Sequence, residues 1–521
     1  MGAKNGIEKF NAANLFVDRH IQEGRGDKVA IYYLDQEITY SEVHEKVNQT
    51  GNALKEMGIG LEDRVMLLLL DCPEFAYSFF GAMKIGAVPI PTNTLLIPAD
   101  YEYLLNDSRA KLLVVSYELL DNITAIIENL LYLKQIIVVG EPAEGCLSFD
   151  SIIKDKSLEL ETANTGIDDA AFWLYSSGTT GFPKGVVHLH HDMAFAAEHY
   201  AKGVLQITEK DITYSVAKLF FAYGLGNGLY FSFYVGASTV LSPSRPLPEH
   251  VYATIDRYKP TLFFGVPSSY AAMIQLETTK DYDMSSIRYC VSAGEPLPKV
   301  IFERWLELWN LEILDGIGTT EILHIFISNI PGDVKPGSTG KVVPGYEAKI
   351  IDPDGYIVPT GEIGTLMIKG HSIAAYYWNK HEKTTETFIG EWINTGDKYF
   401  QDNEGTFWYV GRNDDMIKAG GIWVSPVEVE YCLMEHPAVF ESGVIGRTDE
   451  DGLVKPKAYI VLKEGYEASF ELADELSIFV KTKIAPYKFP RWVQFIPNLP
   501  RTATGKMQRF KLRQLEISDL P

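Results

Sequence analysis

The sequence predicts a multidomain α/β protein. A large N-terminal domain with mainly parallel sheets and an antiparallel β subdomain is expected to precede a small, mobile C-terminal α+β domain. The 521 residues exceed the roughly 250 to 300 residues at which a single hydrophobic core stops growing. Short apolar runs alternate with longer amphipathic ones through most of the chain, and this pattern then changes twice. At least two domains are therefore expected.

The first pattern extends from about residue 15 to residue 344 and indicates strands separated by helices. Strands are expected at Arg64–Leu70, Lys111–Val115, Ala171–Tyr175, Leu262–Val266, Tyr289–Ser292 and Leu311–Leu314. Helices are expected at Glu74–Ile85, His191–Ala201, Ser268–Leu276 and Pro298–Trp309. Such alternation is typical of parallel sheets joined by crossover helices.

The pattern changes at Gly345, where short strands separated by turns such as Asp354-Gly355 indicate an antiparallel subdomain. After Gly411 the tail has helices and strands of its own. These are expected at 425–435, 440–446, 457–463, 472–483 and 493–496. We therefore divide the chain into an N-terminal domain, residues 1–413, and a C-terminal domain, residues 414–521, whose length of about 110 residues can enclose a separate core.

Composition excludes several classes of protein. A formal net charge of −22 argues against nucleic-acid binding, which requires basic surfaces. The uncharged stretch from Leu219 to Ser244 is long enough to cross a bilayer, but its many glycines and hydroxyl residues argue against a membrane span. The four cysteines lie far apart and form no CxxC pair, as expected of free thiols in a reducing compartment. We expect a cytoplasmic protein.

The segment Tyr175–Gly185, YSSGTTGFPKG, is the most informative part of the sequence. Its glycines allow backbone N–H groups to turn toward an anion, its hydroxyls add donors, and Lys184 supplies a positive charge. The apolar strand before it would place the loop at a strand's carboxyl end, where open α/β sheets bind their ligands. The spacing differs from the Walker pattern. Phosphate binding is favoured over a plain surface turn.

Three further segments carry polar groups that suit a nucleotide. Asp315–Glu321, DGIGTTE, reads as a glycine-rich turn whose Glu321 can hold Mg2+, although a helix-capping start fits equally well. A loop carboxylate and a cation that could hold a ribose are suggested by Thr395-Gly396-Asp397 and Gly411-Arg412. Each of these segments, taken alone, is more often a solvated turn. Pro500–Lys506, PRTATGK, has the composition of a flexible tail.

Together and in this order, these segments resemble the acyl-adenylate-forming superfamily, which includes AMP-forming acyl-coenzyme A synthetases. The resemblance covers nearly the whole chain, including Ser292–Pro298, Gly361–Gly370 and Gly411–Gly421. Two segments, Lys218–Phe231 and Asp315–Asn329, look like the benzoate-coenzyme A ligase branch. This resemblance implies ATP, Mg2+ and coenzyme A as cofactors or co-substrates, and a small carboxylic acid as the substrate.

The resemblance also implies roles for individual residues. The β- and γ-phosphates would be held by Ser176, Ser177, Thr179, Thr180 and Lys184. Adenine would lie between Gly294, Glu295 and Pro296 on one side and Asp315, Gly316 and Ile317 on the other. Thr320 would contact the α-phosphate, Glu321 the Mg2+, and Asp397 with Arg412 the ribose. Asp414 would be the hinge, Lys506 the adenylation lysine, and Gly420 and Gly421 the coenzyme A channel.

By the same resemblance, the acid pocket would be lined by uncharged residues: Ala222, Tyr223, Ile317, His324 and Ile325. Without the resemblance, this aromatic run would be read as ordinary core. A benzoate-like acid is expected. Hydroxybenzoate and cyclohexane- or cyclohexenecarboxylate remain alternatives, because an apolar pocket rejects an added hydroxyl by only about 100-fold.

Three other functions compete with a coenzyme A ligase. An adenylation unit that loads a carrier protein would need an acidic group for an amino-acid substrate, and none stands in the pocket set. Luciferase-type oxidation has no recognisable signature in the sequence. A nucleotide-binding sensor would not need the five charged residues Lys184, Glu321, Asp397, Arg412 and Lys506. The sequence does not distinguish a monomer from a homodimer.

Overall fold

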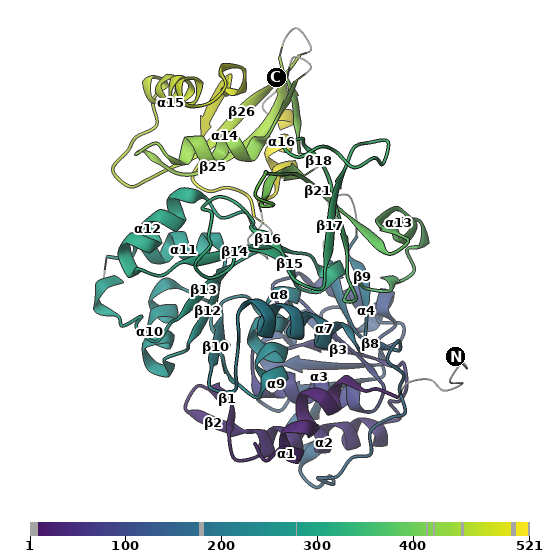
Figure 1. The fold of residues 1–521 in the computed structure, drawn as a ribbon. Helices are drawn as coiled ribbons and strands as arrows, with labels where there is room; N and C mark the ends of the chain where they lie inside the picture. Colours follow the sequence, from purple (N-terminus) through teal and green to yellow (C-terminus); the bar gives the residue numbers. More distant parts are fainter. Residues whose placement is uncertain are drawn as a thin grey trace, which may run out of the picture.

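A computed structural model of the protein describes residues 9–176, 182–277, 279–412, 415–419, 422–449, 453–501 and 507–518. It has the predicted α/β class, with two large sheets in the N-terminal part, smaller antiparallel sheets beside them and a C-terminal part at one end (Figure 1). Among the described residues, none of the helices combines the length and the apolar character that a membrane crossing requires.

The larger of the two main sheets has nine strands. In spatial order they are β16 (Lys341–Val342), β15 (Ile325–Ser328), β14 (Ile313–Gly318), β13 (Tyr289–Ser292), β12 (Leu262–Gly265), β10 (Ile212–Ser215), β11 (Ser238–Leu241), β1 (Val29–Tyr33) and β2 (Gln36–Thr39). Pairing is parallel from β14 through to β1 and antiparallel at both edges. The parallel interior confirms the prediction made from the alternating pattern.

The second main sheet is parallel throughout. Its strands are β4 (Val88–Pro91), β3 (Arg64–Leu68), β5 (Leu112–Ser116), β6 (Gln135–Val139) and β7 (Leu147–Ser148). The longer helices of the N-terminal part are α2 (Tyr40–Glu56), α3 (Pro73–Lys84), α4 (Pro98–Ser108), α10 (Pro248–Tyr258), α11 (Pro267–Gln275) and α12 (Lys299–Trp309). Helix α2 begins at a capping box, in which Thr39 Oγ accepts from Glu42 N at 3.2 Å and the Glu42 carboxylate accepts from Thr39 N at 2.7 Å.

Shorter helical segments connect these elements. They are η1 (Asn14–Asp18), α1 (Arg19–Gln22), η2 (Tyr117–Leu119), α5 (Asp121–Thr124), η3 (Ile127–Asn129), α6 (Phe149–Ile153), α7 (Asp192–Ala196), η4 (Ala197–Val204), α8 (Ala222–Leu225), η5 (Gly226–Tyr230), α9 (Phe231–Val235), η6 (Thr279–Asp281) and η7 (Thr320–Ile322). The uncharged stretch from Leu219 to Ser244 is divided among α8, η5, α9 and strand β11, and its core positions are buried.

Antiparallel sheets form the remainder of the N-terminal part. One contains β17 (Glu347–Ile351), β18 (Gly364–Lys369), β21 (Trp392–Gln401), β20 (Phe388–Ile389) and β22 (Phe407–Arg412). The other contains β8 (Ala170–Ser176), β9 (Lys184–Leu189) and β19 (Tyr376–Tyr377), and α13 (His381–Thr387) follows β19. The expected antiparallel subdomain is therefore present.

The C-terminal part has its own core, with Val429, Leu433, Val444, Ile460 and Leu476 fully buried. Its elements are β23 (Ile417–Ala419), β24 (Ile422–Val424), α14 (Pro426–Met434), β25 (Val439–Thr448), β26 (Val454–Leu462), α15 (Phe470–Lys483), η8 (Pro486–Lys488), β27 (Trp492–Phe495) and α16 (Arg509–Ser518). Its helix α14 contacts β22 of the N-terminal part, and the C-terminal part lies at one end of the molecule (Figure 1). The division at residue 413 remains a prediction.

Three local expectations were wrong. Strand β8 does not end at the edge of an open parallel sheet, because it pairs antiparallel with β9 and the glycine-rich loop joins this pair. Asp315–Gly318 is not a turn, because β14 continues through it and pairs with β15. Asp397 is not in a loop either. It lies inside β21, where Gly396 adopts a φ of +71° that favours glycine.

Candidate functional site

The glycine-rich loop is held firmly at both of its described ends. Ser176 pairs with Lys184 across β8 and β9. The Tyr103 hydroxyl donates to Pro183 O at 3.0 Å, and its ring stacks on Phe182 with 4.7 Å between centroids. Ser176 Oγ is buried and has no hydrogen-bond partner among the described residues. Ser177, Thr179 and Thr180 lie outside the described residues.

Lys184 and Glu321, predicted from distant segments, lie on either side of one tyrosine. Lys184 Nζ is 4.2 Å from the centroid of the Tyr377 ring, and the Tyr377 hydroxyl donates to Glu321 Oε1 at 2.8 Å. Burial lowers the pKa of Lys184, and the Glu321 carboxylate opposes this shift. A cation and a carboxylate are thus held close together beside the glycine-rich loop.

Thr320 is fixed through its backbone. Its carbonyl oxygen lies 2.8 Å from His188 Nε2, and His188 Nδ1 lies 2.7 Å from Asp192 Oδ2. Both side chains are fully buried. The short helix η7 that carries Thr320 and Glu321 is therefore anchored on the β9 strand.

Asp397 and Arg412 face each other across β21 and β22. Arg412 Nη1 donates to Asp397 Oδ1 at 3.1 Å and to Thr395 O at 3.2 Å. Asp397 raises the pKa of Arg412, while burial opposes the shift. The sequence placed these two residues in separate loops, and the strand register brings them together.

The residues expected around adenine come from two neighbouring strands. Gly294, Glu295 and Pro296 follow β13, whereas Asp315, Gly316 and Ile317 belong to β14, its parallel partner. Gly294 has a φ of +93°, which favours glycine. A Cβ at Gly316 would lie 2.9 Å from Ile327 O, so this position also requires glycine.

Asp315 connects these two sides. Asp315 Oδ2 accepts from Leu297 N at 3.3 Å, and Oδ1 has no hydrogen-bond partner among the described residues. Burial raises the pKa of this carboxyl to about 8. The side chain therefore carries a proton at neutral pH and helps to order the turn after β13.

The predicted acid-pocket residues also come together. Tyr223 lies on α8, and its hydroxyl is within hydrogen-bonding distance of Gly265 O at 3.1 Å and Val291 O at 3.2 Å. His324 Nε2 lies 3.3 Å from Tyr223 O and 3.1 Å from Asn227 Oδ1. Ala222 begins α8 and Ile325 begins β15.

His324 is neutral in this environment. Burial lowers its pKa to about 3. Both atoms near Nε2 are acceptors, so Nε2 carries the proton and Nδ1 is left as an acceptor. Nδ1 has no hydrogen-bond partner among the described residues. The predicted pocket set therefore contains no charged side chain.

Sequence reasoning missed two supporting residues. Tyr377 gave no signal, because it stands in an aromatic pair within a short strand. Asp71 is buried, accepts from Leu219 N at 3.0 Å and lies 3.7 Å from Lys218 Nζ, so it holds the start of the acid-pocket segment. A lone aspartate directly after an apolar strand was the signal that could have revealed it.

Asp414, Gly420, Gly421 and Lys506 lie outside the described residues. In the described part of the chain, no three His, Cys, Asp or Glu residues gather in a way that could hold a metal ion. A single carboxylate such as Glu321 still suits Mg2+, which proteins often bind through one or two carboxylates together with substrate phosphates.

Asp315→Asn is expected to stabilise the folded protein more at about pH 8 than at about pH 5. Across this range the unfolded chain has already released the proton that the folded chain retains, because burial raises the folded pKa to about 8 from an ordinary 3.8. The free energy of unfolding of the native protein therefore falls with pH in this range, and asparagine removes that dependence. The Tm values of the native protein and of Asp315→Asn, determined by calorimetry at both pH values, measure this difference in pH dependence.

The exposed Asp474→Asn serves as the control for this comparison. A Tm difference between Asp315→Asn and the native protein that is the same at both pH values would contradict the assignment.

Most of the chain matches known protein families. Residues 17–378 match the family model described as AMP-binding enzyme, and residues 428–506 match the AMP-binding enzyme C-terminal domain. The benzoate–CoA ligase of Thauera aromatica is 48% identical over 510 residues, covering 97% of this chain and 96% of the relative. The 4-hydroxybenzoate–CoA/benzoate–CoA ligase of Rhodopseudomonas palustris is 42% identical, with 99% and 96% covered.

A solved structure extends the similarity to three dimensions. The crystal structure of the anthranilate CoA ligase AuaEII in complex with anthranoyl-AMP has a TM-score of 0.95 and 46% identity, with 99% of each chain covered. The fold is therefore shared over 99% of each chain. The chain belongs to the AMP-binding enzyme family.

Proposed function

We propose that this protein activates a benzoate-like aromatic carboxylic acid with ATP and transfers the acyl group to coenzyme A. In the first step the acid carboxylate attacks the α-phosphorus of ATP, which forms acyl-AMP and releases pyrophosphate. In the second step the coenzyme A thiol attacks the acyl carbonyl, AMP leaves and the thiol proton is released. One observation supports the proposal: β14 carries the predicted adenine residues Asp315–Ile317, and the chain that follows it carries Glu321 and the predicted pocket residues His324 and Ile325.

The first step brings two anions together, so it depends on positive charge and positioning. Lys184 and the glycine-rich loop would hold the β- and γ-phosphates, and Asp397 with Arg412 would hold the ribose. Glu321 would hold Mg2+, which supplies charge neutralisation at the phosphates. Lys506 would bridge the carboxylate and the α-phosphate. The terminal domain would then turn about Asp414, so that Gly420 and Gly421 border the path of the thiol.

The neutral state of His324 favours an aromatic acid with one carboxylate. A second anionic group on the substrate would find no cationic partner among the described residues of the predicted pocket set. A benzoate ring, by contrast, suits the ring faces around this histidine. Phe231 lies 4.4 Å and Tyr223 5.6 Å from it between centroids.

A hydroxylated or aminated ring is the second candidate. His324 Nδ1 and the Tyr230 hydroxyl are buried and have no hydrogen-bond partner among the described residues. Buried polar atoms normally have a partner, so these two atoms favour a ring substituent that can hydrogen-bond there.

A pyrophosphate-exchange assay over a panel of acids, with and without coenzyme A, tests the proposal. Benzoate, the three hydroxybenzoates, 2-aminobenzoate and cyclohexanecarboxylate form the panel. Benzoate is expected to support exchange without coenzyme A and to yield a thioester when coenzyme A is present. Exchange with none of these acids would contradict the proposal, and exchange without thioester formation would favour a carrier-protein acceptor.

Lys506→Ala is expected to lower the adenylation rate by on the order of 100- to 1,000-fold, the usual loss for one key electrostatic donor. Thioester formation from supplied benzoyl-AMP should survive, because that step does not need this charge. The two half-reactions are measured separately, with the exposed Lys511→Ala as control. Equal losses in both half-reactions of a folded variant would show that the assigned role is wrong.

Tyr377→Phe is expected to lower kcat/KM for ATP by roughly 10-fold, the low end for a hydrogen bond to a charged group. The change removes the bond to Glu321 Oε1 and keeps the ring beneath Lys184. Steady-state kinetics with ATP as the varied substrate measure the effect. The neighbouring Tyr376, whose exposed fraction is 40%, gives the matched control Tyr376→Phe. Identical kinetics for the two variants would contradict a role for this hydrogen bond.

A further inference from the structure

Arg501 lies at the base of the segment that carries Lys506. It pairs as an isolated antiparallel bridge with Met507, and Gln508 N donates to Pro500 O at 2.8 Å. The two ends of the intervening segment are therefore held together. Whatever fixes Arg501 also fixes the base from which Lys506 extends.

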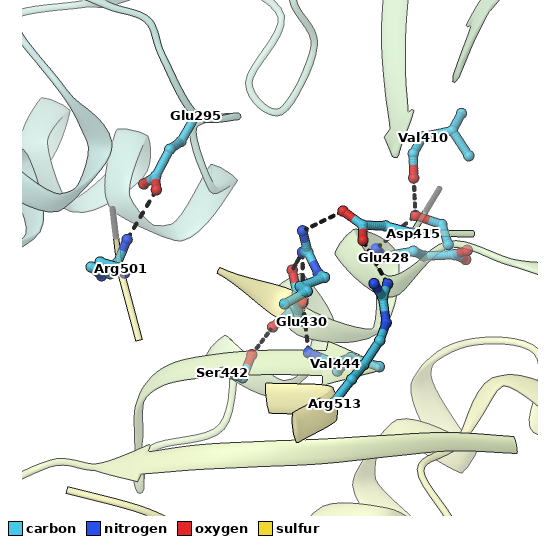
Figure 2. A network of polar contacts seen from close by, with 11 residues as sticks. Glu295, Val410, Asp415, Glu428, Glu430, Ser442, Val444, Arg501 and Arg513 are labelled. Atoms are coloured by element: carbon cyan, nitrogen blue, oxygen red, sulfur yellow. Dashed lines mark hydrogen bonds and ion pairs between the residues drawn. The ribbon is translucent and has the colours of Figure 1, made fainter. Parts of the chain in front are cut away.

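The Arg501 guanidinium joins two carboxylates from different parts of the molecule. Nη1 donates to Glu295 Oε1 at 3.0 Å, and Nη2 donates to Glu441 Oε1 at 3.0 Å. Glu295 follows Gly294 in the predicted adenine turn of the N-terminal part, whereas Glu441 lies on β25 of the C-terminal part. Figure 2 shows Arg501 and Glu295 facing each other across this boundary.

These two ion pairs respond differently to a rotation of the C-terminal part. Arg501 and Glu441 belong to the same body, so their pair moves as a unit. The pair with Glu295 joins the two parts of the chain. A rotation of the C-terminal part, as the proposed function requires, would separate Arg501 from Glu295.

A second arginine cluster links elements within the C-terminal part. Arg509 donates to Glu430 Oε2 at 2.7 Å and to Asp415 Oδ2 at 3.4 Å. Arg513 donates to Asp415 Oδ1 at 2.7 Å (Figure 2). Asp415 is the first described residue after Arg412. These contacts hold Asp415 against α16. We therefore expect the C-terminal part to rotate about an axis on the N-terminal side of Asp415.

We propose that Arg501 is a positioning residue for adenylation: its pair with Glu295 holds the Lys506 segment at the nucleotide, and this pair breaks before the thioester step. The inference rests on the proposed function. Arginine suits this role because its planar fork donates to two carboxylates at once, which a lysine ammonium does with less geometric control. The side chains of Arg501, Glu295 and Glu441 are 21–26% exposed. A partly exposed ion pair contributes a modest free energy, so the Arg501–Glu295 pair can favour one arrangement of the domains and still break when they rotate.

Arg501→Gln in the full-length protein tests the proposal through its two half-reactions. Benzoate-dependent pyrophosphate exchange is expected to fall roughly 3- to 10-fold, the scale of one partly exposed ion pair. Thioester formation from supplied benzoyl-AMP and coenzyme A should be unchanged or faster. Equal losses in both half-reactions, or no loss in exchange, would overturn the proposal.

Two neighbouring carboxylates supply matched variants. Glu295→Gln removes the contact between the bodies from its other side, so it is expected to lower the ratio of the exchange rate to the thioester-forming rate, as Arg501→Gln does. Glu441→Gln removes only the contact within the C-terminal body and should keep the ratio of the two half-reaction rates closer to that of the native protein. The same selective loss in Glu441→Gln as in Arg501→Gln would overturn the role of the contact between the bodies.

A distance measurement tests the same contact without using activity. Spin labels at Glu303→Cys and Glu471→Cys, both exposed, report the separation of the two bodies after Cys146, which is partly exposed, is changed to Ser. Arg501→Gln is expected to broaden or shift the distance distribution of the native protein. An unchanged distribution would overturn the proposal, whereas a native protein inactive with every acid would instead contradict the proposed function.

Discussion

The pairing of β14 with its neighbours β13 and β15 determines where the predicted adenine residues, His324 and Ile325 lie. Ser292 pairs with Asp315 in this register, so the turn after β13 and the end of β14 face each other. Beyond that point β14 pairs antiparallel with β15, so His324 and Ile325 return to lie beside β14. The chain reaches Glu321 directly after β14. One strand thus borders the expected adenine site on one side and the expected ring pocket on the other.

Electrostatic balance explains how an acidic protein can bind an anionic nucleotide. The chain carries a formal net charge of −22, but screening over about 8 Å leaves the nearest groups in control. Three of the described cations are each associated with a carboxylate. Lys184 is linked to Glu321 through Tyr377, Arg412 donates to Asp397, and Arg501 donates to Glu295. The cations are therefore in place before a phosphate group arrives, and little reorganisation is needed.

Much of this could be predicted from the sequence, since apolar periodicity marks buried strands and helices directly. Strand β13 and helix α12 lie where the pattern placed them, and the family resemblance is confirmed. Strand pairing could not be predicted, because it depends on contacts between distant segments. For this reason Asp397 was expected in a loop although it lies in β21, and the glycine-rich loop was assigned to a parallel edge although it joins an antiparallel pair.

Side-chain partners were also beyond the reach of sequence reasoning. Tyr377, Asp71 and Arg501 act through residues that are more than fifty positions away, and no local pattern distinguishes them from other tyrosines, aspartates or arginines. The roles of Lys506 and Asp414 remain predictions, because they rest on the resemblance alone.

In the proposed reaction, an unreactive acid becomes a mixed anhydride with AMP before the coenzyme A thiol attacks. Rapid-quench mixing of enzyme, ATP and benzoate in the absence of coenzyme A tests this order of steps. We expect benzoyl-AMP in an amount close to that of the enzyme, and its conversion to benzoyl-coenzyme A and AMP when coenzyme A is added. Formation of ADP with benzoyl phosphate, or thioester formation without any benzoyl-AMP, would contradict it.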